Sequence, residues 1–317
     1  MEASMNPKVS IGNQNFEKLR KYRAFYVDKT NFIREWWENP DEVTLITRPR
    51  RFGKTLNLSM MECFFSTEFA GRGDLFEDLS VWKHEKYRQL QGTYPVISLS
   101  FAAVKEKDYE STVQRINQIL TDLYYENSFL LESDRLLPEE KEDFRQISNE
   151  MSEVTATMAL HRLSRYLHKH YGKRVILLLD EYDTPMQEAY VNGYWEELVS
   201  FTRSMFNAAF KTNPYLDRAI MTGITRVSRE SIFSDLNNLE VVTTTSGKYA
   251  DCFGFAEEEV FAALDEFGMS DQKKEVKNWY DGFTFGTRTD IYNPWSVLHY
   301  LDKKKATAYW ANSSSNS

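Results

Sequence analysis

A Gly-Lys-Thr sequence shortly after an apolar stretch is the feature that most limits what this chain can fold into. Residues 43–47, Val-Thr-Leu-Ile-Thr, are typical of a strand, and residues 56–65 after the tripeptide favour a helix. A loop between a strand and a helix places its backbone N–H groups and the helix N-terminus where they bind phosphate. Lys54 and the Thr55 hydroxyl are the side chains that such a loop offers to phosphate and Mg²⁺. The stretch therefore predicts a phosphate-binding loop.

The loop departs from the Walker A pattern G-x-x-x-x-G-K-[ST] at its first position, which is Arg48. The alternative is a chance Gly-Lys-Thr in an ordinary loop. If the prediction holds, the arginines of the loop add cationic charge beside Lys54. The residues predicted to contact the ligand here are Arg48, Pro49, Arg50, Arg51, Phe52, Gly53, Lys54, Thr55 and Leu56.

A second apolar stretch ends in carboxylates. Residues 174–180, Arg-Val-Ile-Leu-Leu-Leu-Asp, are too apolar for a half-exposed strand and predict a central strand of a parallel sheet. This layout is the Walker B pattern, in which Asp180 holds Mg²⁺ and Glu181 polarises the attacking water. The alternative is an acidic cap at a strand end. It loses weight because two independent signals occur in the expected order.

A further strand, residues 217–223, leads into polar and cationic residues. Thr222 or Thr225 is predicted to contact a γ-phosphate or the attacking water, and Arg226 or Arg229 to neutralise charge in the transition state. The alternative, a helix N-terminal segment with surface arginines, remains open at this stage.

Together these signals predict an α/β fold: a P-loop NTPase parallel sheet of about five strands, with helices on both faces and a C-terminal helical lid. Residues 94–101 and 241–245 supply the remaining strands, and the expected strand order is 5-1-4-3-2. The expected division is an N-terminal segment packing on the core, residues 1–30; a core, residues 31–250, with a helical insertion at about 108–171; and the lid, residues 251–317. The polar end of the chain suggests truncation.

Composition excludes several classes of protein. With 317 residues and 42% hydrophobic content, the chain can bury a large core. A net charge of −8 gives no overall attraction for nucleic acid or anionic membranes, so no direct nucleic-acid contact is expected. Two cysteines exclude a disulfide framework. The sequence shows neither a secretory signal nor an apolar run of membrane-spanning length, so a cytoplasmic location is expected.

Several motifs as a set resemble the bacterial AAA-ATPase-like family, over about residues 10 to 317. They are Tyr26-Val-Asp-Lys-Thr30, Arg48-Pro-Arg-Arg-Phe-Gly-Lys-Thr55, Leu177-Leu-Leu-Asp-Glu-Tyr-Asp-Thr-Pro185, Thr222-Gly-Ile-Thr-Arg226, Ser231-Ile-Phe-Ser-Asp-Leu-Asn-Asn-Leu239, Trp279-Tyr-Asp-Gly-Phe283 and Tyr292-Asn-Pro-Trp-Ser296. The family looks like a distant relative of AAA+ and signal-transducing P-loop ATPases. In that family arginine is the usual residue at the position of Arg48. The resemblance implies an ATP-binding α/β domain with a helical lid, and many members carry a PD-(D/E)XK nuclease-like domain after it, which here would lie beyond Ser317.

The leading hypothesis is Mg²⁺-dependent ATP hydrolysis that acts as a conformational switch for an attached or partner effector. Lys54 and the loop amides hold phosphates, Thr55 and Asp180 hold Mg²⁺, and Glu181 activates water. One alternative is a regulatory scaffold that binds ATP without hydrolysis, and another is a small-molecule kinase. A GTPase is disfavoured because the chain has no Asn-Lys-x-Asp stretch. Oligomerisation is possible, with the arginines acting within one subunit or across to a neighbour.

Overall fold

The computed structural model describes residues 8–225 and 232–311. A five-stranded sheet forms its centre, and every neighbouring pair of strands in it is parallel. Its strands are β1 (Val43–Thr47), β2 (Val96–Ser100), β3 (Val175–Asp180), β4 (Leu216–Gly223) and β5 (Leu239–Val242). The order β2-β3-β4-β1-β5 is the predicted order, and β4 lies between the strands that carry the two motifs.

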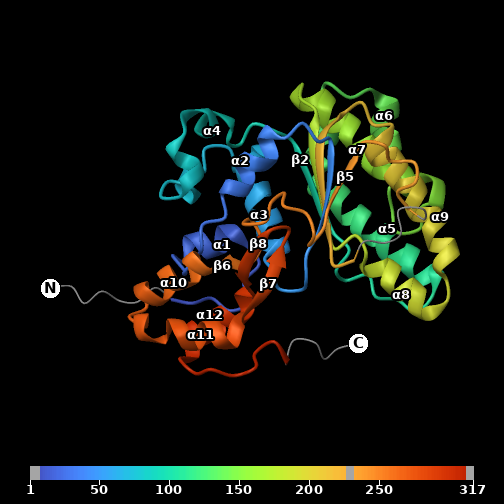
Figure 1. The fold of residues 1–317 in the computed structure, drawn as a ribbon. Helices are drawn as coiled ribbons and strands as arrows, with labels where there is room; N and C mark the ends of the chain where they lie inside the picture. Colours follow the sequence, from blue (N-terminus) through green and yellow to red (C-terminus); the bar gives the residue numbers. More distant parts are fainter. Residues whose placement is uncertain (1–7, 226–231, 312–317) are drawn as a thin grey trace.

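Helices cover both faces of the sheet (Figure 1). One side carries α2 (Asn31–Glu38), α3 (Lys54–Phe65) and α4 (Glu85–Leu90); the other carries α5 (Tyr109–Glu126), α6 (Pro138–Arg145), α7 (Glu153–Tyr171), α8 (Thr184–Asn192) and α9 (Trp195–Phe206). Short 3₁₀ turns span Thr67–Phe69, Gly73–Leu75, Ser80–Lys83 and Ser128–Glu132, and a π-helical turn spans Asn207–Lys211.

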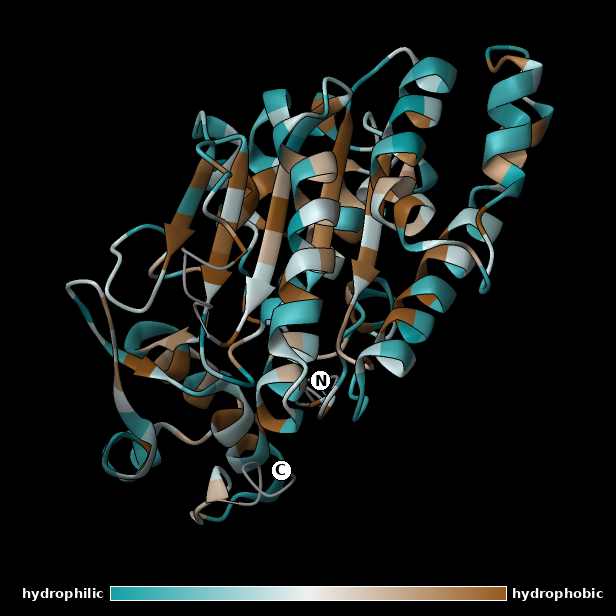
Figure 2. Cartoon of the chain, turned by 90° about the vertical axis from the view of Figure 1, so that its right-hand side faces the viewer, coloured by the Kyte–Doolittle hydropathy of each residue, from teal (hydrophilic) through white to brown (hydrophobic). Residues whose placement is uncertain are grey.

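The strand β3 shows why this sheet needs two covered faces. All six of its residues are buried, and alternate side chains enter different cores. Leu177 and Leu179 pack with the helices on the α5–α9 side, whereas Ile176 and Leu178 pack with those on the α3 side. Figure 2 shows the strands as the most hydrophobic part of the cartoon, between more polar helices. Such a strand is stable only in the middle of a sandwiched sheet.

The C-terminal part contains a second sheet that the sequence did not reveal. Three antiparallel strands, β6 (Phe255–Ala256), β8 (Arg288–Tyr292) and β7 (Asp281–Phe285), pair in that order. They accompany α10 (Glu257–Glu266), a 3₁₀ turn at Ser270–Gln272, α11 (Lys273–Tyr280) and α12 (Pro294–Lys303). The predicted C-terminal helices are present, and the small antiparallel sheet beside them was not expected. These strands are only two to five residues long, so their alternation of apolar and polar residues gives little sequence signal.

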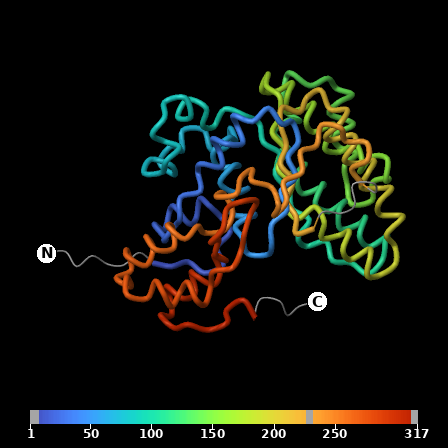
Figure 3. The backbone as a smooth tube through the Cα atoms, in the orientation of Figure 1, coloured from blue at the N-terminus to red at the C-terminus, as the bar shows by residue number. Residues whose placement is uncertain are grey.

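The N-terminal segment joins both parts of the molecule. The helix α1 (Phe16–Lys21) packs on α3, where the Phe16 backbone N–H donates to the Ser59 hydroxyl at 2.9 Å. Phe25 packs edge-to-face on Phe267, the residue directly after α10, with ring centroids 5.2 Å apart. Figure 3 shows this blue segment running beside the orange C-terminal helices. The division at residue 30 remains a prediction.

Glu62, a partly buried residue of α3, gives the fold a testable pH dependence. Burial, reinforced by the charge of Glu68, raises the pKa of the Glu62 carboxyl to about 7. The unfolded chain loses that proton near pH ~4.3. Between these two values the folded state binds more protons, so the free energy of unfolding falls as the pH rises through this window.

We expect Glu62→Gln to stabilise the protein at about pH 8 and to have little effect at about pH 4, because glutamine imitates the protonated acid. Urea unfolding at both pH values measures the difference. The exposed Glu132 provides the matched control, since Glu132→Gln should change stability little at either pH. An equal effect of Glu62→Gln at both pH values would contradict the assignment.

Candidate active site

The predicted phosphate-binding loop connects β1 to α3 through left-handed backbone. Gly53, the residue before α3, has φ +82°, and Arg51 has φ +67°. Glycine adopts such angles without strain, whereas a non-glycine residue at φ > 0 is uncommon and is held there by its surroundings. The first turn of a helix leaves its N–H groups without partners inside the helix. The loop therefore ends where a helix presents free donors.

Lys54 is folded back onto its own loop. Its Nζ donates to the backbone carbonyls of Arg48 and Pro49, both at 2.9 Å, and the side chain is buried. Burial lowers the pKa of the Lys54 amine, and the nearby charges of Asp180, Glu181 and Asp183 act in the opposite direction. The amine is thus held near three carboxylates by two neutral acceptors.

The two motifs meet in a direct hydrogen bond. The Thr55 hydroxyl donates to Asp180 Oδ2 at 2.6 Å, although the two residues are 125 positions apart. The other oxygen of Asp180 accepts a bond from the Thr222 hydroxyl at the end of β4. Hydroxyl and carboxylate oxygens are the ligands that Mg²⁺ prefers, so this donor set fits the predicted ion.

Glu181, directly after β3, has a strained backbone. Its φ is +50°, a left-handed value that is uncommon outside glycine. Its N–H donates to the Thr222 hydroxyl at 3.3 Å, and its carboxylate accepts a bond from the Thr184 hydroxyl at 3.0 Å. Such strain persists only where neighbouring groups fix it, and it concentrates at functional sites.

A cavity of about 1060 Å³ lies over these residues. Its lining includes the loop residues from Arg50 to Asn57 together with Glu181, Thr184 and Ile224. It also includes residues of the N-terminal segment and of α12, among them Phe25, Tyr26, Val27, Pro294, Trp295 and Leu298. The predicted site residues in the described part of the chain that do not line it are Arg48, Pro49, Asp180, Thr222 and Thr225. The predictions for Arg226 and Arg229 concern residues outside the described part of the chain.

Arg48 is fully buried and its guanidinium has other partners. It donates to the carbonyls of Thr47 at 3.0 Å, Thr243 at 2.8 Å and Lys248 at 3.4 Å, and lies 4.5 Å from the centre of the Phe285 ring. Burial lowers the pKa of Arg48 to about 10. In this structure the guanidinium fixes the 243–248 segment against the loop. A nucleotide-binding role for Arg48 stays a prediction.

We expect Arg48→Met to lower the free energy of unfolding by about 2–4 kcal/mol, because it removes a buried charged donor from one buried and two partly buried carbonyls. Chemical denaturation measures the loss. Arg50→Met is the matched control: Arg50 is exposed, and the expected change is within about 0.5 kcal/mol. Equal stability of the two variants would contradict a structural role for Arg48.

Two other loop residues contact the C-terminal part of the chain. The Arg51 guanidinium lies 3.7 Å from the centre of the Trp295 ring. Phe52 is buried among Ala250, Ala256, Phe285 and Ile291, and its ring centroid lies 4.7 Å from that of Phe283. The phosphate-binding loop is therefore part of the packing of the small antiparallel sheet.

Sequence reasoning missed the role of Tyr182 and Asp183. Both are fully buried directly after Glu181, and both contact Thr225. The Tyr182 hydroxyl donates to the Thr225 carbonyl at 2.8 Å, and Asp183 Oδ2 accepts from the Thr225 N–H at 2.8 Å and its hydroxyl at 2.7 Å. The available signal was a third acidic residue within four positions of Asp180.

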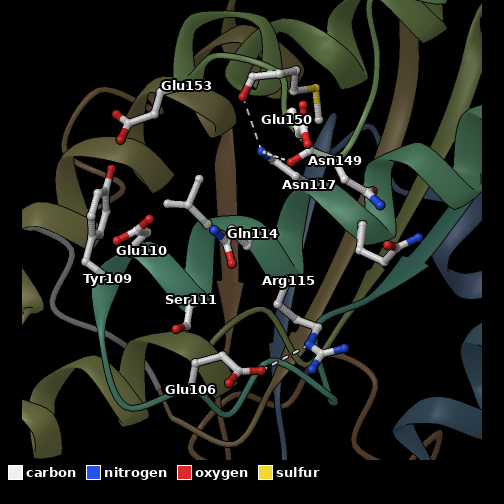
Figure 4. A pocket seen from close by; sticks show the side chains of 13 residues that line it. Glu106, Tyr109, Glu110, Ser111, Gln114, Arg115, Asn117, Asn149, Glu150 and Glu153 are labelled. Carbon is white, nitrogen blue, oxygen red and sulfur yellow. Dashed lines mark hydrogen bonds and ion pairs between the residues drawn. The ribbon is translucent and has the colours of Figure 1, made fainter.

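A second cavity, of about 870 Å³, lies elsewhere (Figure 4). It is formed by the first turns of α5 and the residues that precede α7. Its lining is rich in glutamate, with Glu106, Glu110, Glu150 and Glu153, and Arg115 pairs with Glu106 at 3.0 Å. None of the predicted site residues lines it. The cavity at the loop is therefore the candidate active site.

Among the described residues, one group of carboxylates has a spacing suited to a metal ion: Glu257, Asp281 and Asp290. The Lys277 amine already lies there, 2.5 Å from Glu257 and 3.4 Å from Asp290. It supplies the positive charge that the three acids require. No helix in the described part of the chain is long and apolar enough to cross a membrane.

Comparison with known proteins gives two matches. The model of a family described as predicted AAA-ATPase matches residues 10–233. An uncharacterized protein in the vnfD 5′ region of Azotobacter chroococcum mcd 1 is 27% identical over 310 residues, which cover 96% of this chain and 53% of that protein. The chain thus spans about half the length of this curated relative. No solved structure matches the chain.

Proposed function

Because the chain belongs to the predicted AAA-ATPase family, we propose that it binds ATP with Mg²⁺ in the cavity at the loop, hydrolyses it, and uses the cycle as a conformational switch. Membership implies ATP binding and hydrolysis in general terms. The residue roles, the ion and the switch are the proposal.

The observation that carries the proposal is the 2.6 Å hydrogen bond between Thr55 and Asp180. It joins the residue after the loop lysine to the carboxylate at the end of β3, the two positions that hold Mg²⁺ in a P-loop site. The Thr55 and Asp180 oxygens would hold the ion. When bound, Mg²⁺ neutralises negative charge on the phosphate oxygens.

Lys54 and the N-terminus of α3 bind the phosphates. The lysine amine exchanges its two carbonyl acceptors for phosphate oxygens, which form stronger, charge-assisted bonds. Arg50 is exposed on the cavity wall and adds a second cation. The helix N-terminus supplies N–H donors and the positive end of the helix dipole.

Glu181 acts on the attacking water. Its carboxylate lines the cavity that holds Lys54 and Thr55, and it accepts a hydrogen bond from the neutral Thr184 hydroxyl. It accepts the proton that water loses as it attacks the γ-phosphorus, and ADP departs as the leaving group. A kinase would transfer the γ-phosphoryl group to an acceptor molecule in place of water, and none of the lining residues named above indicates a site for such an acceptor.

The base and ribose are proposed to lie against the N-terminal segment and α12. Phe25, Tyr26, Trp295 and Leu298 line that part of the cavity and offer flat, apolar surface to a purine. The Tyr26 hydroxyl donates to Met60 Sδ at 3.4 Å and accepts from the Lys29 N–H at 3.3 Å, and these bonds hold the ring in the cavity wall.

The switch proposal rests on Arg51 and Phe52. Their contacts with Trp295, Phe283 and Phe285 link the loop that holds phosphates to the C-terminal part of the chain. Changes in the loop on hydrolysis would alter this packing and reach an attached or partner effector. A nuclease-like domain beyond residue 317 remains an expectation.

The test is ATP binding by calorimetry combined with phosphate release by the wild-type protein, with and without Mg²⁺. We expect saturable binding, Mg²⁺-dependent release and weaker competition by GTP than by unlabelled ATP. Tight binding without release would establish the scaffold alternative. Release that requires an added acceptor would establish a kinase, and absence of binding would refute the proposal.

A further inference from the structure

The residues that follow β3 and β4 are joined by hydrogen bonds beside Glu181. We call these residues, Tyr182, Asp183, Ile224 and Thr225, the clamp. Beyond the last paired residues of the strands, the Tyr182 N–H donates to the Thr222 carbonyl at 2.9 Å. Tyr182 and Asp183 then hold Thr225 from both sides, the tyrosine at its carbonyl and the aspartate at its N–H and hydroxyl. Glu181 is thus the first residue of a segment that is fixed along its whole length.

In this clamp, Asp183 Oδ2 is the carboxylate oxygen that accepts the most hydrogen bonds. Its Oδ2 accepts from Ile224 N at 3.0 Å and from Gln187 Nε2 at 2.9 Å, in addition to the two groups of Thr225. Four donors on Oδ2 offset much of the cost of burying this charge, while Oδ1 is buried without a hydrogen-bond partner among the described residues. The carboxylate thereby links the end of β4 to the first turn of α8.

Tyr182 and Asp183 can pack against the end of β4 because residue 223 is a glycine. A Cβ on this residue would lie 2.6 Å from Tyr182 Cε1 and 2.7 Å from Asp183 Oδ1. Real Cβ atoms do not approach other atoms this closely. The last residue of β4 therefore has to lack a side chain for Tyr182 and Asp183 to lie against it.

From this geometry we infer that Asp183 is a positioning residue, which holds Glu181 in its left-handed conformation so that the carboxylate faces the attacking water. The inference rests on the proposed hydrolysis. Asp183 does not line the cavity, and it acts through the 181–183 turn. Thr184, the next residue, completes the arrangement by donating its hydroxyl to the Glu181 carboxylate.

The experiment is a double-mutant cycle with Asp183→Asn and Glu181→Gln, measured as single-turnover phosphate release and as ATP affinity. Asparagine keeps the shape and an acceptor oxygen but loses the charge. We expect Asp183→Asn alone to lower turnover roughly tenfold and to leave ATP affinity within about twofold, because a displaced base loses rate rather than binding. When Asp183→Asn is added to Glu181→Gln, it should cause no further loss of turnover, because Asp183 acts only through Glu181.

A second pair of variants covers the case in which Asp183→Asn does not fold. Thr225→Val removes one donor to Asp183, and Thr225→Ser keeps it. We expect valine, and not serine, to lower turnover. The inference is overturned if the losses multiply in the Glu181→Gln background, if ATP affinity falls in parallel, or if valine and serine behave alike. Absence of wild-type turnover would instead refute the proposed hydrolysis, and this inference with it.

Discussion

Glu181→Gln is expected to lower the turnover of ATP about a hundredfold or more while ATP remains bound, because the amide cannot accept a proton. The side chain keeps its size and its bond from the Thr184 hydroxyl, so the 181–183 turn should persist. The variant should therefore retain nucleotide through several rounds of purification. Single-turnover phosphate release gives the rate, and calorimetry gives the affinity.

Glu196→Gln is the matched control for this change. Glu196 is an exposed glutamate in the first turn of α9, outside the cavity lining, and its replacement should leave turnover within about twofold. Wild-type turnover in Glu181→Gln would show that another group activates the water. A loss of ATP affinity equal to the loss of rate would assign Glu181 to binding.

Lys54→Ala is expected to weaken ATP binding at least about thirtyfold, because loss of one partner from a buried, charge-assisted contact costs about 2–5 kcal/mol. The effect on stability should be small or favourable. The buried amine is held only by two backbone carbonyls, and burial lowers its pKa, which shows that the site stabilises the charge poorly without a ligand. Calorimetry measures the affinity, and thermal unfolding without nucleotide measures the stability.

The matched control for Lys54→Ala is Lys107→Ala, which removes an exposed lysine that does not line the cavity. Its ATP affinity should equal that of the wild type. The addition of ATP should raise the thermal midpoint of the wild type and of Lys107→Ala, but not that of Lys54→Ala. Unchanged affinity in Lys54→Ala would remove the phosphate-binding role of the loop.

The central sheet was predictable because its strands carry strong local signals. Residues 174–180 form an unbroken apolar run that fits only a covered strand, and the two motifs fix which strand ends face the site. The strand order follows from placing one strand between them. The boundaries of β5 were predicted less accurately. The strand runs from Leu239 to Val242, so it begins two residues and ends three residues before the predicted run 241–245, because Thr243 and Ser246 form a turn.

The helix start at α12 was also predictable. Pro294 occupies its first turn, and the Asn293 side chain accepts a bond from the Trp295 N–H; proline in the first turn and asparagine at the cap are both local signals of a helix start. By contrast, β7 begins at Asp281-Gly282, which has the composition of a turn. Long-range pairing with β8 overrides that local preference.

Site residues that belong to a sequence motif were predictable. Residues whose partners depend on how the fold buries them were not. Lys54, Thr55, Asp180 and Glu181 lie together, and local sequence was enough to select them. Arg48 was selected for its charge, yet its guanidinium partners lie near residues 243–248, about two hundred positions away. Nothing in the local sequence indicates that the Arg48 guanidinium is buried. Asp183 likewise acquires its partners from β4 and not from its own motif.

Phe52 packs against residues that lie outside the part of the chain matched by the family model. The family match ends at residue 233, but the pocket that encloses Phe52 is built from Ala250, Ala256, Phe285 and Ile291. A fragment trimmed to the matched residues would expose this aromatic side chain at the tip of the phosphate loop and release Arg51 from Trp295. The smallest piece of this protein that can be studied as a nucleotide-binding unit therefore extends through the antiparallel sheet to α12.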